Sequence, residues 1–309
     1  MLYRDFGRLG WKVSAIGLGT WNLSNQWGPI DDSTAYETVR AAMDGGMNLI
    51  DTAEAYGIPF GLSEQRLGVA LMGIRHQVFI VSKIGHWGQR IGHMVPKTHP
   101  ELVRLCAHAI LYRLRTDWVD VMLCHEGRPE NPDVYLDAFE GLKKEGKIRA
   151  YGISTDNLEM LRRFNERGAC EAVEVNYSLL NRSAEKELLP YCRENGIAVL
   201  IRGPLAMGML SGKYSADSVF TDSVRASWNT KEQAHARFLR NAAKVEQLKK
   251  AMKPGEDMIA AALRFVISHP AHPVAIPGAK SAEQAAMNAR AGERVLSDQE
   301  IARLASLVE

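Results

Sequence analysis

The stretch Asp51-Thr-Ala-Glu-Ala-Tyr56-Gly57 follows a short apolar segment at 47–50, so a strand-like run ends on a carboxylate, with a phenol five residues further on. Three later apolar segments end in the same manner, on Lys83, His125 and Ser154. The carboxyl ends of the strands of a parallel barrel meet at one mouth, so we expect these side chains to gather there. Asp, Tyr, Lys and His together suit proton transfer to a carbonyl.

Apolar strand-like segments alternate with helical segments along most of the chain, which is typical of a parallel sheet. The expected strands cover 15–18, 47–50, 78–81, 119–123, 148–153, 172–175, 197–201 and 274–276. The expected helices cover 31–44, 62–73, 98–114, 132–145, 156–167, 184–195 and 256–268. Asp31, Asp156 and Ser183 are candidate capping residues. Eight strand–helix units favour an α/β fold closed into a (β/α)8 TIM barrel over an open, doubly wound sheet.

Three segments lie outside this repeat. Residues 3–6 and 11–14 predict an N-terminal β-hairpin that plugs one end of the barrel. Residues 203–251 include a Gly/Ser-rich stretch and a helix at about 231–251, a pattern typical of a lid or a ligand-binding loop. Two extra C-terminal helices are expected at about 281–290 and 298–308. We expect residues 1–309 to form a single domain.

The composition indicates a small-molecule partner. The 309 residues include 38 Lys plus Arg against 36 Asp plus Glu, with no long basic stripe to favour nucleic acid or an anionic membrane. No uncharged run approaches the ~20 residues that cross a bilayer, and no signal-peptide core opens the chain, so we expect a cytoplasmic protein. The four cysteines are too widely spaced for a zinc or redox motif, and we expect no metal. The oligomeric state stays open.

Eight motifs, in order, resemble the aldo-keto reductase superfamily along nearly the whole chain. They are Gly17-Leu-Gly-Thr-Trp21, Asp51-Thr-Ala-x-x-Tyr56-Gly57, Ser82-Lys83, His125, Gly152-Ile-Ser154, Asn176-Tyr-Ser-Leu-Leu-Asn-Arg182, Pro204-Leu-Ala-x-Gly208-x-Leu-x-Gly-Lys213 and Ile276-Pro-Gly-Ala-Lys280. The resemblance implies an oxidoreductase with an N-terminal hairpin that binds NADP(H) without a Rossmann domain. The chain has no Gly-x-Gly-x-x-Gly fingerprint, which agrees with that expectation.

The resemblance also implies four catalytic residues: Asp51, Tyr56, Lys83 and His125. Tyr56 is then the general acid, and His125 bonds the substrate carbonyl. A free phenol has a pKa near ~10, which a neighbouring ammonium such as that of Lys83 lowers. Asp51 would orient the lysine through a buried ion pair. Each residue alone is more simply explained as a cap, a packing residue or a surface charge, but together they predict a carbonyl reductase.

The nucleotide site follows from the same resemblance, which favours NADPH over NADH. The implied residues are Gly19, Thr20, Trp21, Asp51, Ser154, Asn157, Glu174, Arg202, Pro204, Leu205, Gly208, Leu210, Lys213, Gly278, Lys280, Ser281, Gln284 and Asn288. Ser154 would bond the nicotinamide carboxamide, and the loop around Gly208 would lie along the pyrophosphate. Lys280 and Ser281 open a helix and would bind the adenosine 2′-phosphate.

Two positions depart from the family pattern. Thr155 stands where the family usually has an Asn, which leaves the assignment of Asn157 open. The expected sixth and seventh strands end in opposite charges, Glu174 and Arg202, where the family usually has Gln and an aromatic residue. Because an arginine beside an oxidised nicotinamide needs a neutralising carboxylate, we predict that Glu174 and Arg202 pair beneath the ring.

The implied substrate pocket comprises Trp21, Tyr56, Trp87 and His125, and Trp27 and Trp228 are further candidates. Aromatic walls suit aldehydes and ketones of many shapes, including sugars, so neither the substrate nor the direction of the reaction is indicated. An NADP(H)-binding regulatory subunit with little turnover is the alternative. A metal-dependent barrel hydrolase finds little support, because the nine histidines include no His-x-His pair.

Overall fold

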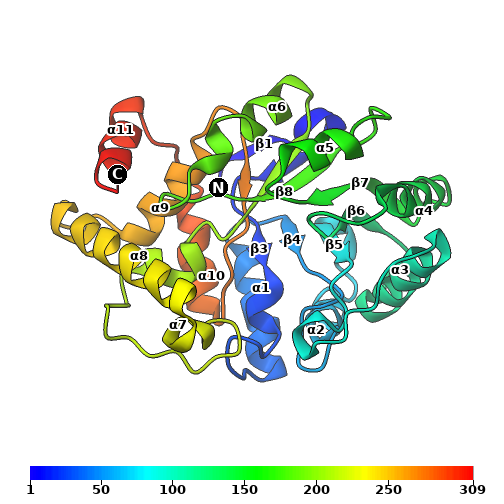
Figure 1. The fold of residues 1–309 in the computed structure, drawn as a ribbon, viewed down its shortest axis with the longest axis horizontal. Coiled ribbons are helices and arrows are strands. Elements are labelled where there is room, and N and C mark those ends of the chain that lie inside the picture. Colours follow the sequence, from blue (N-terminus) through cyan, green and yellow to red (C-terminus); the bar gives the residue numbers. More distant parts are fainter. Residues whose placement is uncertain (309) are drawn as a thin grey trace.

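The computed structural model describes residues 1–308, whose main sheet is a ring of parallel strands with helices around it (Figure 1). The sheet has eight strands in the order β10-β9-β8-β7-β6-β5-β4-β3. Isolated bridges from Ile16 to Ala275 and from Gly19 to Gly278 join its two edges. The predicted (β/α)8 barrel is therefore confirmed.

All eight predicted strands are present, and their bounds differ from the prediction by no more than three residues. They are β3 (Leu18–Gly19), β4 (Leu49–Asp51), β5 (Phe79–Ile84), β6 (Val119–Cys124), β7 (Ile148–Ser154), β8 (Ala172–Asn176), β9 (Ala198–Arg202) and β10 (Val274–Ala275). The largest differences are at the start of β3, where apolar residues precede the paired ones, and at the end of β5, where the pairing continues through Ser82 and Lys83.

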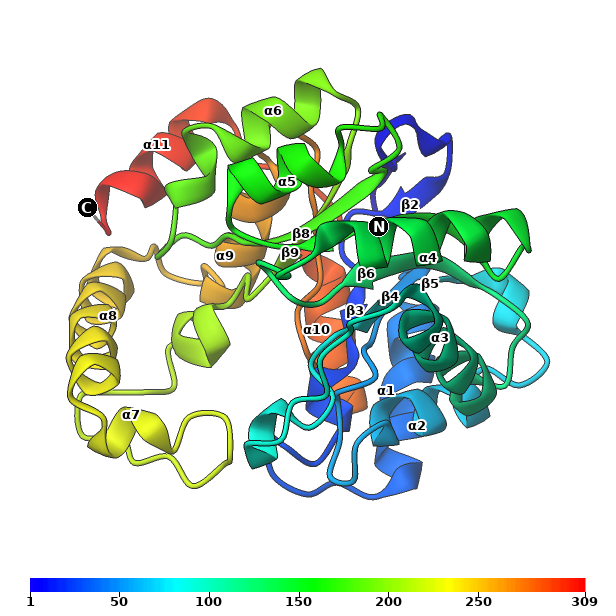
Figure 2. The same ribbon diagram turned by 45° about the vertical axis from the view of Figure 1, so that its right-hand side comes forward.

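Helices cover the outside of the ring, as Figures 1 and 2 show from two directions. They are α1 (Asp32–Asp44), α2 (Leu62–Ala70), α3 (Pro100–Leu114), α4 (Pro132–Lys144), α5 (Leu158–Phe164), α6 (Leu188–Glu194), α9 (Met258–Ile267), α10 (Ala282–Ala291) and α11 (Asp298–Ser306). The side chain of Asp31 accepts a hydrogen bond from the Thr34 amide, which confirms it as the cap of α1.

Two predicted caps are wrong. Asn157, not Asp156, caps α5 and accepts from the Met160 amide. Asp156 instead accepts from the Asn176 amide at 2.7 Å, a long-range contact that local sequence does not indicate. Ser183 begins a short 3-10 turn, Ser183–Glu185, and α6 starts only at Leu188.

Alternating side chains of the strands fill the inside of the barrel. Leu49, Val81, Leu123, Ala172 and Leu200 belong to one buried apolar cluster in the interior. Successive strand residues point to opposite faces, so the residues two places further on point inward as well. This alternation carries Asp51, Lys83, His125, Glu174 and Arg202 to the inside of the barrel mouth.

The predicted N-terminal hairpin is confirmed as β1 (Tyr3–Asp5) paired antiparallel with β2 (Lys12–Ser14). Phe6 and Val13 are buried in the same cluster as the inward-facing strand residues. The hairpin therefore plugs the amino end of the barrel, away from the strand ends that carry the polar residues.

The segment after β9 contains a 3-10 element, η6 (Ala206–Ser211), then α7 (Ser227–Thr230) and the long α8 (Glu232–Ala251). Phe220, Trp228 and Phe238 pack as an aromatic cluster, with ring centroids 5.1 to 5.7 Å apart. This cluster holds α7 against α8, and Figure 2 shows both helices to one side of the barrel. Within residues 1–308, none of the helices combines the length and apolar character needed to cross a bilayer.

Candidate active site

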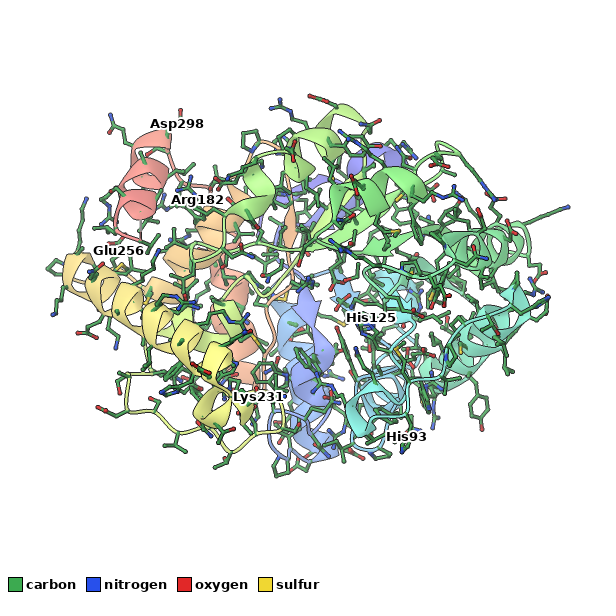
Figure 3. The ribbon with its side chains drawn as sticks, in the orientation of Figure 1. His93, His125, Arg182, Lys231, Glu256 and Asp298 are labelled. Carbon is green, nitrogen blue, oxygen red and sulfur yellow. The ribbon has the colours of Figure 1, made fainter. Side chains whose placement is uncertain are left out.

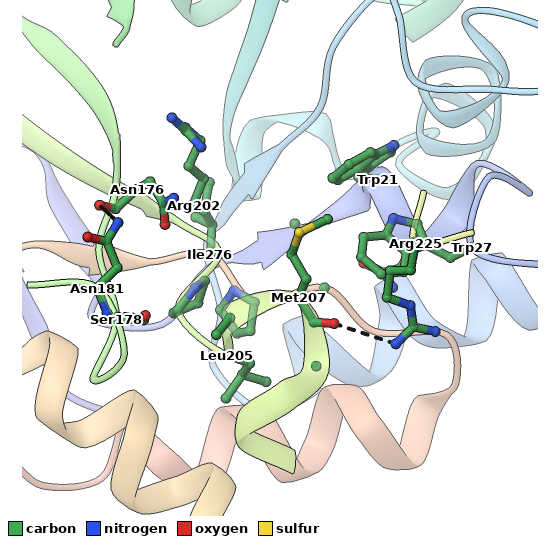
Figure 4. Close-up of a pocket in the computed structure, with 18 of the residues that line it drawn as sticks. Trp21, Trp27, Asn176, Ser178, Asn181, Arg202, Leu205, Met207, Arg225 and Ile276 are labelled. Carbon is green, nitrogen blue, oxygen red and sulfur yellow. Dashed lines mark hydrogen bonds between the residues drawn. The ribbon is translucent and has the colours of Figure 1, made fainter. Parts of the chain in front are cut away.

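A cavity of about 1620 Å³ opens at the carboxyl ends of the strands. Trp21, Trp27 and Arg225 lie on one side of it, and Asn176, Asn181 and Arg202 on the other (Figure 4). Asp51, Tyr56, His125, Ser154 and Glu174 line its inner end. The predicted convergence of distant strand ends on one mouth is therefore present in the structure.

Lys83 is the centre of a buried polar cluster. Its Nζ lies 2.6 and 2.5 Å from the two carboxylate oxygens of Asp51 and donates to the Thr52 carbonyl at 3.0 Å. The same Nζ lies 3.2 Å from the hydroxyl of Tyr56. Both Lys83 and Asp51 are buried, so the ion pair beside the tyrosine hydroxyl is shielded from water.

Glu174 is a third member of this cluster. Its Oε2 lies 3.1 Å from Lys83 Nζ, within ion-pair distance although without hydrogen-bonding geometry. Burial, followed by the charge of Glu174, raises the pKa of the Asp51 carboxyl well above its usual range, against the opposing effect of Lys83. Two carboxylates thus share one ammonium.

The predicted pairing of Glu174 with Arg202 is wrong. Within residues 1–308, Glu174 pairs with Lys83, and Arg202 lies 2.5 Å from a carboxylate oxygen of Asp156. The register explains the difference, because β8 and β9 align Glu174 with Leu200 and Asn176 with Arg202. Glu174 therefore lies two residues deeper in the barrel than Arg202 does.

The balance of effects on the Tyr56 hydroxyl differs from the prediction. Burial raises the pKa of Tyr56, Lys83 lowers it, and Asp51 and Glu174 raise it again, with a net shift above the usual range. Lys83 thus acts in the predicted direction but does not dominate. The phenol is accordingly protonated at neutral pH, which is the form that a general acid needs.

His125 lies near the middle of the molecule (Figure 3) and faces Tyr56 edge-on, with ring centroids 5.9 Å apart. Its other neighbour is His86, whose ring stacks on it at 4.2 Å. Burial and the nearby cationic residues lower the pKa of His86 to about 4, and they lower the pKa of His125 well below its usual range. Both rings are therefore neutral at physiological pH.

Most of the predicted nucleotide-binding residues line the cavity. They are Gly19, Trp21, Asp51, Ser154, Asn157, Glu174, Arg202, Pro204, Leu205, Gly208, Lys213, Gly278, Lys280, Gln284 and Asn288. Thr20, Leu210 and Ser281 are not part of the lining. Thr20 bonds the Asp51 carbonyl, Leu210 is fully buried, and Ser281 caps α10 through the Gln284 amide.

The loop between Gly203 and Lys213 has an unusual backbone. Ala206, Met207 and Gly208 have successive positive φ angles of 48°, 55° and 92°. Consecutive left-handed residues turn neighbouring N–H groups toward one side, an arrangement that suits anionic oxygens. Lys280, which also lines the cavity, donates to the carbonyl of Trp27 at 2.7 Å.

The predicted substrate residues separate into two groups. Trp21 stacks on Tyr56 with ring centroids 5.7 Å apart, and Trp27 packs edge-on to Trp21 at 5.0 Å. Trp87, by contrast, is not part of the cavity lining, because it packs on Phe60 and lies beneath the guanidinium of Arg113. Sequence reasoning also missed His86 and Arg90, which follow β5 in an irregular loop and carry no motif signal.

Comparisons with known proteins agree with this geometry. The profile of the Aldo/keto reductase family matches residues 15–309. The aldo-keto reductase YhdN of Bacillus subtilis is 33% identical over 293 residues, which cover 92% of this chain and 86% of that protein. The NADH-specific methylglyoxal reductase of Escherichia coli is 35% identical over 226 residues, which cover 67% of this chain and 68% of that protein.

A solved structure from Klebsiella pneumoniae, an aldo-keto reductase in complex with NADPH, has a TM-score of 0.75 and 30% sequence identity. The match covers 100% of this chain and 96% of that one. These matches confirm the family resemblance drawn from the eight motifs. The predicted nicotinamide cofactor is confirmed at the level of the family.

Proposed function

The chain belongs to the aldo/keto reductase family, and from that premise we propose that it reduces an aldehyde or ketone to an alcohol, reversibly, with NADPH as the hydride donor and Tyr56 as the general acid. The observation that carries this proposal is the distance of 3.2 Å between the Tyr56 hydroxyl and Lys83 Nζ. Lys83 is in turn held by two buried carboxylates, so the ammonium cannot move away from the phenol.

The proton is handled by this chain's own residues. In the direction of reduction, the Tyr56 hydroxyl gives its proton to the carbonyl oxygen, and the ammonium of Lys83 stabilises the phenolate that remains. His125, neutral in its buried position, orients the carbonyl oxygen toward Tyr56. Such general acid assistance contributes ~10² to 10⁴-fold to the rate. In the direction of oxidation, the phenolate accepts the proton of the alcohol.

Several residues fit a nicotinamide dinucleotide. The Ser154 hydroxyl makes no hydrogen bond to any residue in the part of the chain that the structure describes, so it is available to a carboxamide at the inner end of the cavity. Lys280 lies just before the N-terminus of α10, where a cation and helix N–H groups suit a 2′-phosphate. NADPH, when bound, supplies the hydride that reaches the carbonyl carbon.

The test is NADPH oxidation with a panel of aldehydes and ketones, beside Tyr56→Phe. We expect turnover by the native protein and a loss of about 10² to 10⁴-fold in kcat for the variant, with unchanged affinity for NADPH. Tight NADPH binding by the native protein without turnover of any carbonyl would instead favour a cofactor-binding regulatory subunit. Absence of NADPH binding would contradict both functions.

A further inference from the structure

The carboxylates at the inner end of the cavity all have a cationic partner. Asp51 and Glu174 lie within ion-pair distance of Lys83, and Asp156 lies within ion-pair distance of Arg202. The acidic groups nearest the reacting centre thus pair with Lys83 or Arg202, and Arg90 is the partner of none of them. A further cation that faces the cavity therefore has none of these carboxylates as its partner.

Arg90 is such a cation. It lies in a 3-10 turn, Gln89–Ile91, after β5, and its guanidinium carbon is 4.7 Å from the centre of the Trp21 ring. Within residues 1–308 it has no ion-pair partner and donates no hydrogen bond, although it lines the cavity. Its guanidinium N–H groups are therefore open to a ligand.

Arg90 is also close to the reacting groups. The Trp21 ring beneath it stacks on the ring of Tyr56, with centroids 5.7 Å apart. Burial is the main cause of the low pKa values of His86 and His125, and the charge of Arg90 lowers both pKa values further. Both histidines are therefore neutral and add no positive charge to that of Arg90. The charge of Arg90 acts on the part of the cavity beside Tyr56 and His125, where the substrate would bind.

We propose that the carbonyl substrate carries an anionic group, a carboxylate or a phosphate, which the guanidinium of Arg90 binds while the carbonyl oxygen lies between Tyr56 and His125. This inference rests on the proposed reductase function. Because a single tryptophan ring separates Arg90 from Tyr56, the anion stands only a few carbon atoms from the carbonyl. The guanidinium fork suits a planar carboxylate in particular.

The experiment compares each anionic substrate with a neutral counterpart of similar shape. The pairs are succinic semialdehyde with its methyl ester, para-carboxybenzaldehyde with its methyl ester, and glyceraldehyde phosphate with glyceraldehyde. For the native protein we expect kcat/KM to favour at least one anionic member by about tenfold or more, as for a hydrogen bond to a charged group. The pair with the largest ratio distinguishes a carboxylate from a phosphate.

Arg90→Gln should bring that ratio close to one, because kcat/KM should fall much more for the anionic member than for the neutral member. Arg90→Lys should keep a part of the preference, and higher salt should reduce the preference of the native protein. Arg40→Gln is the matched control, because Arg40 is exposed on α1 and outside the cavity. It should change nothing.

Two results would overturn the inference but not the reductase function: turnover of the neutral members as fast as the anionic ones, or equal losses for both members in Arg90→Gln. The second result would mean that Arg90 acts by supporting Trp21. Absence of NADPH-dependent turnover with every carbonyl tested would be a failure of the proposed function itself, and the inference would fall with it.

Discussion

Lys83 Nζ lies 3.1 Å from Glu174 Oε2, and both side chains are buried at the mouth of the barrel. The lysine that supports Tyr56 is therefore shared between two carboxylates, Asp51 and Glu174. The acidity of Tyr56 reflects burial first, and then the opposing charges of Lys83 and of this pair of carboxylates.

Glu174→Gln should move the pH dependence of catalysis to lower pH. Glu174 raises the pKa of Tyr56, so its neutralisation lowers that pKa. Oxidation of an alcohol needs the phenolate, so kcat/KM for oxidation should begin to rise about one pH unit lower than in the native protein. Reduction needs the phenol, so the decline of kcat/KM for reduction at alkaline pH should also move to lower pH. The measurement is kcat/KM against pH in both directions.

Glu283→Gln is the control for this prediction, because Glu283 lines the same cavity from α10 and is not among the groups that shift the pKa of Tyr56. Its pH profile should match that of the native protein. A shift of the Glu174→Gln profile to higher pH would contradict the assigned sign.

Lys83→Met should destabilise the fold as well as reduce turnover. The substitution leaves Asp51 and Glu174 buried without their cation, and breaking a buried ion pair costs about 3 to 5 kcal/mol. The free energy of unfolding in urea, without cofactor, measures this loss. Adding Asp51→Asn should restore a part of it. Lys250→Met, at an exposed position of α8, should stay within ~0.5 kcal/mol of the native protein.

Lys280→Met should weaken NADPH binding by about tenfold and change NADH binding little, since only NADPH has the 2′-phosphate that the lysine would meet. Fluorescence titration with both nucleotides gives the two Kd values. Lys253→Met, at an exposed position before α9, serves as the control. An equal loss for NADPH and NADH would show that Lys280 acts through its hydrogen bond to the Trp27 carbonyl instead.

Gly152→Ala should be among the most damaging single substitutions in the barrel wall. A Cβ at this position would lie 1.7 Å from the carbonyl oxygen of Ala172 on the neighbouring strand. We expect more than about 3 kcal/mol of lost stability in urea unfolding. Gly141→Ala within α4 should be neutral or stabilising by up to ~1 kcal/mol, because its nearest neighbour is the flexible end of Arg104. Similar stabilities for the two variants would contradict this account.

The eight strands could be predicted because each is a short apolar run, and four of these runs lead into a polar residue: Asp51, Lys83, His125 or Ser154. The ion-pair partners at the barrel mouth could not be predicted. All the charged candidates lie at the carboxyl ends of the strands, and they differ only in their depth inside the barrel. Glu174 and Arg202 lie near the ends of neighbouring strands, yet the register places them in different layers of the barrel. Only the pairing of β8 with β9 reveals this.

Contacts outside the strands were harder still to foresee. Local sequence suggests that Asp156 is a helix cap, but its side chain accepts a hydrogen bond from the Asn176 amide, 20 residues further along the chain. Arg90 belongs to no periodic pattern. Its proximity to Tyr56 depends on the position of the Trp21 ring, which packs between the two side chains. Such positions are set by tertiary packing, and sequence spacing does not encode them in a readable way.

The hairpin that closes the amino end of the barrel also determines how ligands enter and leave the active site. Because Phe6 and Val13 fill that end, ligands reach Tyr56 and leave it through the opening at the carboxyl ends of the strands. When the nucleotide binds at the inner end of the cavity, a carbonyl compound that has bound first blocks the access of the nucleotide to its site. Turnover should then follow a compulsory order, in which the nucleotide enters first and departs last.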